Sequence, residues 1–172
     1  VEKNIKILAK AKNKKISDLH ACVLKRPRHE KIIKILNDMK VNINFITDGD
    51  IAGVLSVIGN KPKNDIYYST GGGPEGVLAA AALSCYGGQI QGRLVLNEEE
   101  KIRAKKLGIQ DFNKKYNIED MVKGDVIFCA TGVTSGELTK GVKDLGNEYE
   151  VNTFALHKSK RINKIVTNIY NK

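Results

Sequence analysis

The sequence predicts an α/β fold, a layered α/β/α sandwich whose helices cover a largely parallel sheet. Between residues 20 and 87, a short apolar run, a polar turn and a helical stretch follow one another three times. Alternation of strand, turn and helix is typical of a parallel sheet, because the helices are the connections between its strands. The length of 172 residues favours one domain, or at most two small lobes.

The expected elements follow in chain order. Spacing places Ile5, Leu8 and Ala9 on one face of an amphipathic helix over 2–12. Strands are expected over 20–24, 41–46 and 65–70, alternating with helices over 30–40, 51–58 and 74–87, the last closed by glycine. An exposed helix over 97–109 and a buried strand over 125–131 come next, and 150–157 and 161–170 alternate like the strands of a hairpin.

Composition narrows the class of protein. Hydrophobic residues make up 41% of the chain, but no apolar run approaches the roughly 18 residues that a membrane helix needs. No secretory leader is recognisable, so we expect a cytoplasmic protein with no membrane partner. The widely spaced Cys22, Cys85 and Cys129 support neither a disulfide framework nor a CxxC metal site, and we expect them to be reduced core residues.

The net charge of +10 raises the possibility of a nucleic-acid partner. Only five of the 29 basic residues are arginines, and the lysines are scattered among asparagines and isoleucines. This pattern indicates a compositional bias towards lysine, asparagine and isoleucine rather than a basic surface that binds nucleic acid, so no nucleic-acid partner is expected. A steeply salt-dependent gel shift with DNA would overturn that expectation.

Three unusual loops follow the three expected strands. The glycine-rich loop (STGGGPEG, 69–76) leads into the expected helix over 74–87. Gly71, Gly72 and Gly73 are expected to take positive φ and to turn their N–H groups towards an anion, with Pro74 in the first turn of the helix. Such a nest binds phosphate. Glu75 would repel that phosphate unless a cation lay between them, which predicts a bridging divalent metal ion. The alternative is an ordinary turn with an acidic helix start.

The loop RPRH (26–29) contains two of the few arginines. Pro27 fixes the backbone between Arg26 and Arg28, whose guanidinium groups can clamp a phosphate in a bidentate manner. A solvated loop is the alternative. His29 is expected to begin the following helix or to donate a hydrogen bond near the site rather than to act as a base or metal ligand.

The loop TDGD (47–50) places two carboxylates across a glycine. Asp48 and Asp50 could bind a metal ion or accept hydrogen bonds from neighbouring sugar hydroxyls. The alternative is an Asp-Gly turn in which Asp50 caps the next helix. Because ligands of open α/β sheets bind outside the carboxyl ends of the strands, all three loops should meet in one crevice that suits a doubly phosphorylated sugar.

The strings RPRHEKII, ITDGDIAGVL, TGGGPEGVLAAAAL, QGRL and IFCATGVTSGEL resemble, in order and spacing, the class II fructose-1,6-bisphosphatases of bacteria. Some members also hydrolyse sedoheptulose 1,7-bisphosphate. The resemblance covers essentially the whole chain as the C-terminal part of such an enzyme, and it implies the fold of the lithium-sensitive sugar phosphatases. It also implies hydrolysis of fructose 1,6-bisphosphate to fructose 6-phosphate and phosphate in gluconeogenesis, and assembly into a homo-oligomer.

The resemblance also implies roles for individual residues. It makes Glu75 a ligand of a catalytic Mn²⁺ or Mg²⁺ ion. The residues that it implies for substrate binding are Arg26, Pro27 and Arg28 at the remote phosphate, Asp48, Gly49 and Asp50 at the sugar, and Gly72 beside the metal loop. It leaves the catalytic acid and base unassigned.

The chain departs from the family pattern in one respect. The family's acidic motif of the Asp-Pro-(Leu or Ile)-Asp-Gly-Thr type does not occur, and the chain begins with Val1. We therefore expect an N-terminal metal-binding half to be missing. Metal-assisted hydrolysis needs several carboxylates, so residues 1–172 alone should bind sugar phosphate weakly and hydrolyse it poorly or not at all. A non-catalytic module that binds a sugar phosphate or nucleotide is the competing interpretation.

Overall fold

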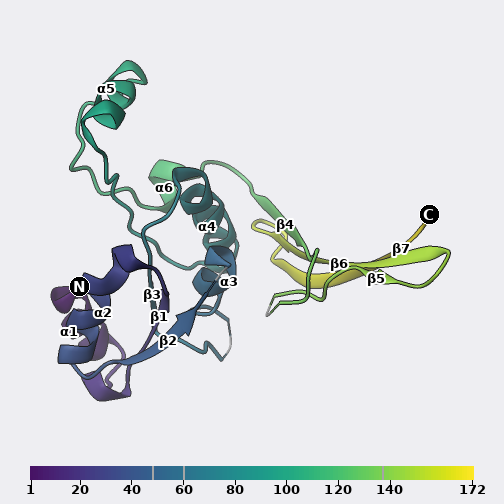
Figure 1. Ribbon diagram of the computed structural model, residues 1–172, viewed down its shortest axis with the longest axis horizontal. Coiled ribbons are helices and arrows are strands. Elements are labelled where there is room, and N and C mark those ends of the chain that lie inside the picture. The colour runs from purple at the N-terminus through teal and green to yellow at the C-terminus, as the bar shows by residue number, and fades with distance from the viewer. Residues whose placement is uncertain (48, 60, 137) are drawn as a thin grey trace. The chain divides into compact units, whose positions relative to one another are not determined.

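A computed structural model describes residues 1–47, 49–59, 61–136 and 138–172. The chain divides into two compact units, Val1–Glu75 and Gly76–Lys172, and each is described by itself. The fold is mixed α/β, with one parallel and one antiparallel sheet (Figure 1). Asp48 lies outside the described residues, so the prediction for its side chain stays a prediction.

The first unit contains a three-stranded parallel sheet of order β2-β1-β3. Its elements are α1 (Glu2–Ala11), η1 (Ile16–Asp18), β1 (His20–Leu24), η2 (Pro27–His29), α2 (Glu30–Asp38), β2 (Asn42–Ile46), α3 (Asp50–Leu55) and β3 (Ile66–Tyr68). At its end α4 (Gly73–Tyr86) begins and continues into the second unit. Every strand and helix expected before residue 87 is confirmed, with bounds shifted by up to three residues.

Helices α1 and α2 pack on one face of this sheet (Figure 1). Ile5 of α1 and Leu36 of α2 are fully buried against Ala21 and Val23 of β1. Successive strand residues point to opposite faces, so Ala21 and Val23 share this face while Cys22 and Leu24 point to the other. The predicted apolar stripes of both helices therefore form the core on this side.

Helix α3 covers the opposite face of the sheet, and a glycine allows it to lie close. A Cβ built on Gly53 would be 2.7 Å from Ile46 Cδ1 and 2.7 Å from Tyr67 Cε2. Real Cβ atoms do not approach other atoms so closely, so a larger residue at 53 would push α3 off the sheet. The close packing fixes α3, and with it Asp50 at the start of α3, relative to Tyr67 of β3.

A buried carboxylate ties the end of α1 to the amino ends of β1 and β3. Asp65, with its side chain 4% exposed, accepts hydrogen bonds from Lys12 Nζ at 2.7 Å, Lys14 Nζ at 2.9 Å and the His20 N–H at 2.9 Å. Burial alone would raise the pKa of Asp65, but these three donors outweigh it and lower the pKa from 3.8 to about 2. This end of the sheet lies away from the loops that carry the candidate site.

The second unit is built around an antiparallel sheet. Strand β6 (Glu148–His157) pairs with β7 (Ile162–Asn171) along its length, and with β4 (Ile127–Thr131) and β5 (Lys143–Asp144) on its other side. The hairpin of β6 and β7 is confirmed. Helices α5 (Glu98–Lys106) and α6 (Ile118–Met121) precede the sheet. The helix expected over 97–109 is confirmed as α5, and a capping box of Asn97 and Glu100 starts it.

One prediction for this half of the chain is wrong. The parallel sheet lies in the first unit, whereas the strands of this half are antiparallel and are joined by turns rather than by crossover helices. The strand that was expected to be buried, β4, alternates instead: Phe128 is buried, whereas Ile127 and Cys129 are exposed. Among the described residues, no helix combines the length and apolar character that spanning a bilayer requires.

Candidate functional site

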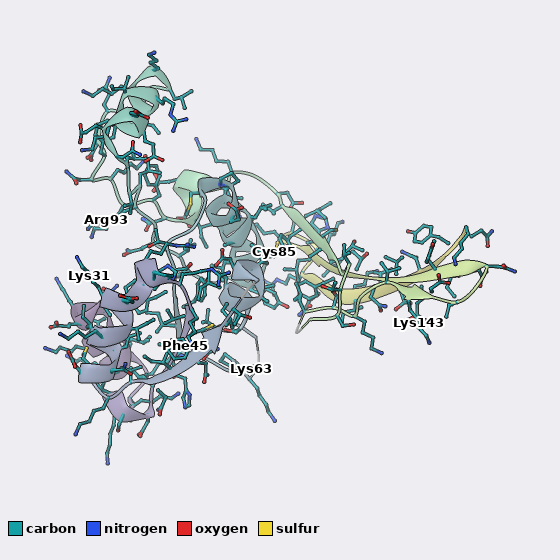
Figure 2. The ribbon with its side chains drawn as sticks, viewed as in Figure 1. Lys31, Phe45, Lys63, Cys85, Arg93 and Lys143 are labelled. Carbon is teal, nitrogen blue, oxygen red and sulfur yellow. The ribbon has the colours of Figure 1, made fainter. Side chains whose placement is uncertain are left out.

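The candidate site lies at the carboxyl edge of the parallel sheet in the first unit. Strands β1, β2 and β3 run in the same direction and end at Leu24, Ile46 and Tyr68, so the loops that follow them leave from the same edge. The structure places the RPR loop after β1, Gly49 and Asp50 after β2, and the glycine loop after β3. The predicted convergence is therefore present in the backbone; Figure 2 shows side chains on this unit, including Lys31 and Phe45.

Arg28 reaches from the first loop to the third. Its Nε donates a hydrogen bond to the carbonyl oxygen of Thr70 at 2.5 Å, which leaves its two terminal nitrogens to contact an anion. Arg26 uses Nη1 to donate to the Lys25 carbonyl at 3.1 Å, within its own loop. Pro27 begins the 3₁₀ turn η2, where its missing N–H costs nothing. The arginines are thus placed differently: Arg28 is hydrogen-bonded to the glycine loop, and Arg26 to its own loop.

Asp50 is held against β3 rather than acting as a helix cap. Gly49, in the left-handed region at φ 83°, is the N-cap of α3, and Asp50 is its first residue, with no side-chain cap bond. Asp50 Oδ1 accepts hydrogen bonds from the Tyr67 hydroxyl at 2.5 Å and the Ser69 hydroxyl at 3.3 Å. Burial and the Asp50 carboxylate together raise the pKa of Tyr67, so its hydroxyl stays protonated as a donor.

Glu75 folds back onto the glycine loop from the first turn of α4. A Cβ built on Gly72 would overlap Glu75 Oε2 and lie 3.1 Å from Glu75 Cδ. A Cβ on Gly71 would lie 3.4 Å from Asp50 Oδ2. Two carboxylates thus lie close to the loop, Asp50 near Gly71 and Glu75 near Gly72.

The expected reason for the three glycines is wrong. None of Gly71, Gly72 and Gly73 is among the glycines with positive φ, so the loop is not the left-handed nest that the sequence suggested. At Gly72 the missing side chain matters because the Glu75 carboxylate occupies that space. Pro74 does lie in the first turn of α4, as predicted.

Reasoning from the sequence missed three residues of this site. Tyr67 and Ser69 orient Asp50, and Thr70 contacts Arg28 through its backbone. The alternation of β3 would have placed Tyr67 on the α3 side of the sheet, but the sequence does not show that its hydroxyl reaches Asp50. Thr70 acts through its main chain, so its residue type carries no signal.

Glu75 suits a hard divalent cation, because it is an exposed carboxylate and such ions prefer oxygen ligands. Among the residues that the structure describes, no group of three or more His, Cys, Asp and Glu side chains could hold a metal ion. Glu75 could therefore serve as one ligand of such an ion.

A second polar cluster, in the antiparallel sheet, has the composition of a nucleophilic triad, and Ser159 Oγ lies 3.3 Å from His157 Nε2, but the shorter bond of Ser159 goes to the carboxylate. Asp125 Oδ2 accepts from the Ser159 hydroxyl at 2.6 Å and lies 2.8 Å from His157 Nε2. An activated serine would instead give its proton to the imidazole nitrogen. Here both side chains turn towards the same carboxylate, which lowers the pKa of Asp125, so the cluster ties the β6–β7 turn to the start of β4.

The fold and the gathered residues define an α/β protein whose strand-end loops present a guanidinium group and two carboxylates around a glycine loop. Residues 1–170 match the family model described as bacterial fructose-1,6-bisphosphatase, glpX-encoded. The chain belongs to this family.

Curated relatives agree with this assignment. A Synechococcus sp. (strain JA-2-3B'a(2-13)) protein, D-fructose 1,6-bisphosphatase class 2/sedoheptulose 1,7-bisphosphatase, is 35% identical over 185 residues, covering 99% of this chain and 53% of its own. The fructose-1,6-bisphosphatase class 2 of Haemophilus influenzae (strain ATCC 51907 / DSM 11121 / KW20 / Rd) is 36% identical over 181 residues, covering 96% of this chain and 54% of its own. The chain therefore spans about half the length of the curated relatives that it matches.

Proposed function

We propose that this chain forms the sugar-phosphate-binding part of a class 2 fructose-1,6-bisphosphatase. The whole enzyme would hydrolyse fructose 1,6-bisphosphate to fructose 6-phosphate and inorganic phosphate. One observation carries the proposal: Arg28, Asp50 and Glu75, from three different elements, all lie against the segment from Tyr67 to Gly72. A ligand in contact with that segment could bind the Arg28 guanidinium group through one phosphate and the Asp50 carboxylate through its hydroxyls. Glu75 would face the end of the ligand that binds the metal ion.

Each side chain has a distinct task in this proposal. The terminal nitrogens of Arg28 bind the phosphate that is not cleaved, with Arg26 and Pro27 shaping the loop around it. Tyr67 and Ser69 both donate to Asp50 Oδ1, so Asp50 Oδ2 is the oxygen that we assign to a sugar hydroxyl. Gly49, Asp48 and Gly72 complete the proposed surface. Binding energy from the remote phosphate is then used to align the reacting phosphate.

Glu75 is the residue that would hold a divalent cation, Mn²⁺ or Mg²⁺. Such an ion, held by Glu75, would supply polarisation of a phosphoryl oxygen and activation of the attacking water. The contribution of this chain is the position of Glu75, which Gly72 allows to fold back towards the ligand. We further propose a cytoplasmic, gluconeogenic role, a homo-oligomeric whole enzyme, and sedoheptulose 1,7-bisphosphate as a second substrate.

A chimeric enzyme tests this function. In the Haemophilus influenzae enzyme, the region that matches this chain is replaced by the chain itself, and phosphate release from fructose 1,6-bisphosphate is measured with Mn²⁺. We expect turnover by the chimera, little or none by residues 1–172 alone, loss of turnover in Glu75→Gln, and a raised KM in Arg28→Ala. A chimera that unfolds cooperatively but binds no fructose 1,6-bisphosphate would contradict the proposal.

A non-catalytic binding module is the second candidate function. It is favoured by the finding that the described residues offer Glu75 but no group of three metal-ligating side chains. In that case residues 1–172 would bind a sugar phosphate or nucleotide with unchanged affinity when Mn²⁺ is removed, and the chimera would bind substrate without turnover. An open reading frame that continues upstream and encodes the acidic motif would favour the enzyme.

A further inference from the structure

His29, which directly follows the arginine pair, is fully buried between the end of β1 and the glycine loop. Its Nδ1 lies 2.6 Å from the Leu24 carbonyl oxygen, at the last residue of β1. On the other side of the ring, Nε2 lies 2.8 Å from the backbone nitrogen of Thr70. The imidazole therefore joins two chain segments that are 46 residues apart in sequence, at Leu24 and Thr70.

These two partners select one form of the ring. A carbonyl oxygen can only accept a hydrogen bond, so Nδ1 has to carry a proton. A backbone N–H can only donate, so Nε2 has to be unprotonated. His29 is thus neutral, in its Nδ1–H form. The Thr70 carbonyl, 3.3 Å from Nε2, is not a hydrogen-bond partner of the ring in this form.

The same threonine is held from both sides of its backbone. Its N–H donates to His29 Nε2, and its carbonyl accepts from Arg28 Nε at 2.5 Å. Arg28 and His29, which are consecutive in the first loop, therefore form hydrogen bonds with the carbonyl oxygen and the N–H of Thr70 in the third loop. Thr70 is two residues before Gly72 and five before Glu75, so its position sets where the loop carrying the carboxylate begins.

We infer that His29 is a positioning residue, which in its neutral Nδ1–H form fixes the glycine loop against Arg28 and so sets the spacing between the phosphate-binding guanidinium and Glu75. This inference rests on the proposed function for its consequence in ligand binding. The contact itself does not, and can be measured without a ligand. In this proposal His29 is assigned no contact with the ligand or the metal ion; it acts through Thr70.

The first test is on the unaltered chain. Long-range ¹H–¹⁵N correlation spectra of residues 1–172 at neutral pH distinguish a protonated from an unprotonated ring nitrogen. We expect His29 to show a protonated Nδ1 and an unprotonated Nε2. The Nε2–H form, or a ring protonated on both nitrogens, would overturn the inference, because neither can accept from Thr70.

Two substitutions separate positioning from a general structural role. The amide of asparagine matches the position of Nδ1, so His29→Asn can keep the contact with Leu24 but loses the one with Thr70. The amide of glutamine matches Nε2, so His29→Gln can keep an oxygen facing the Thr70 N–H. Both variants replace a buried ring by a smaller polar side chain, and each serves as the control for the other.

The readouts are hydrogen exchange of the Thr70 amide and the affinity for fructose 1,6-bisphosphate in the presence of Mn²⁺. In His29→Asn we expect exchange to be at least about tenfold faster and affinity to be about tenfold weaker, the size expected for one lost hydrogen bond at a binding loop. His29→Gln should recover most of both. Equal behaviour of the two variants, or unchanged exchange in His29→Asn, would refute the role of His29. If the unaltered chain and the chimera bind no bisphosphate, the proposed function fails, while the ring spectra and Thr70 exchange still decide whether His29 holds the loop.

Discussion

Replacing Gly72 by alanine should displace Glu75 while leaving the fold intact. The added Cβ would overlap Oε2 of Glu75 and lie 3.1 Å from Cδ and 3.5 Å from Oε1. To restore ordinary contact, the carboxylate has to move by about 1 Å, which rotation of the side chain can supply at little cost because Glu75 is exposed. Gly72 does not adopt positive φ, so alanine causes no backbone strain.

The effect on stability should be small and the effect on activity large. We expect the free energy of unfolding, measured in urea, to change by no more than about 0.5 kcal/mol. A misplacement of about 1 Å at a reacting centre can reduce the rate about 100-fold, so kcat of the chimera with Mn²⁺ should fall by about 10- to 100-fold.

The matched control is Gly76→Ala, one residue after Glu75 in the same helix. Among the described residues, no atom outside its chain neighbours and its own helix backbone lies within 4 Å of a Cβ built there, and alanine has the higher helix propensity. We expect this variant to keep kcat and to be equally or more stable. Full activity of Gly72→Ala would show that the position of the Glu75 carboxylate is not important, and equal losses in both variants would show that the helix start, not the carboxylate, is sensitive.

Two further predictions concern hydrogen bonds within the first unit, one beside the candidate site and one at the opposite end of the sheet. Tyr67→Phe removes a hydrogen-bond donor to the Asp50 carboxylate. It should lower the free energy of unfolding of the first unit in urea by about 1–2 kcal/mol and weaken sugar-phosphate binding. If both values were unchanged, the position of Asp50 would not depend on Tyr67. Asp65→Asn should lower the free energy of unfolding by up to about 2 kcal/mol at pH 7. The folded pKa of Asp65, about 2, lies below the usual 3.8, and each pKa unit corresponds to ~1.36 kcal/mol. Salt should reduce this loss, because the lysine partners are partly exposed. A depressed pKa stabilises the fold above about pH 4 and this contribution is lost as pH falls towards 2, so the difference between Asp65→Asn and the unaltered chain should shrink over that range; a constant difference would contradict the linkage.

The parallel half of the fold could be predicted because its local signals agree. Apolar stripes, turn residues and a helix-starting Pro74 all indicate the same alternation of strands and helices, and parallel strands bring their carboxyl ends to one edge. The burial of strands in the antiparallel half could not be predicted as well, because an apolar run such as VIFCA fits a fully buried strand and a half-buried strand equally well. Ile127 and Cys129 point away from the buried face, and this depends on pairing partners far along the chain.

The site shows a similar division. Residue type and spacing indicated Arg28, Asp50 and Glu75, because charged side chains at strand ends carry chemical information. The contacts that orient them involve the Tyr67 hydroxyl, the Thr70 backbone and both nitrogens of His29, and these depend on distances between strands. At the glycine run the predicted physical reason is wrong: the constraint is the approach of a carboxylate, not positive φ.

Paramagnetic line broadening by Mn²⁺ tests the central claim most directly. Broadening falls steeply with distance from the ion, so ¹H–¹⁵N spectra of residues 1–172 with fructose 1,6-bisphosphate and a small amount of Mn²⁺ report where the ion sits even when binding is weak. The account predicts that broadening is centred on Gly72 to Gly76, with ligand-induced shifts at Arg28 and Asp50, and that Glu75→Gln abolishes the broadening there. Broadening centred instead on the acidic start of α5, at Glu98–Glu100, or unaffected by Glu75→Gln, would contradict it.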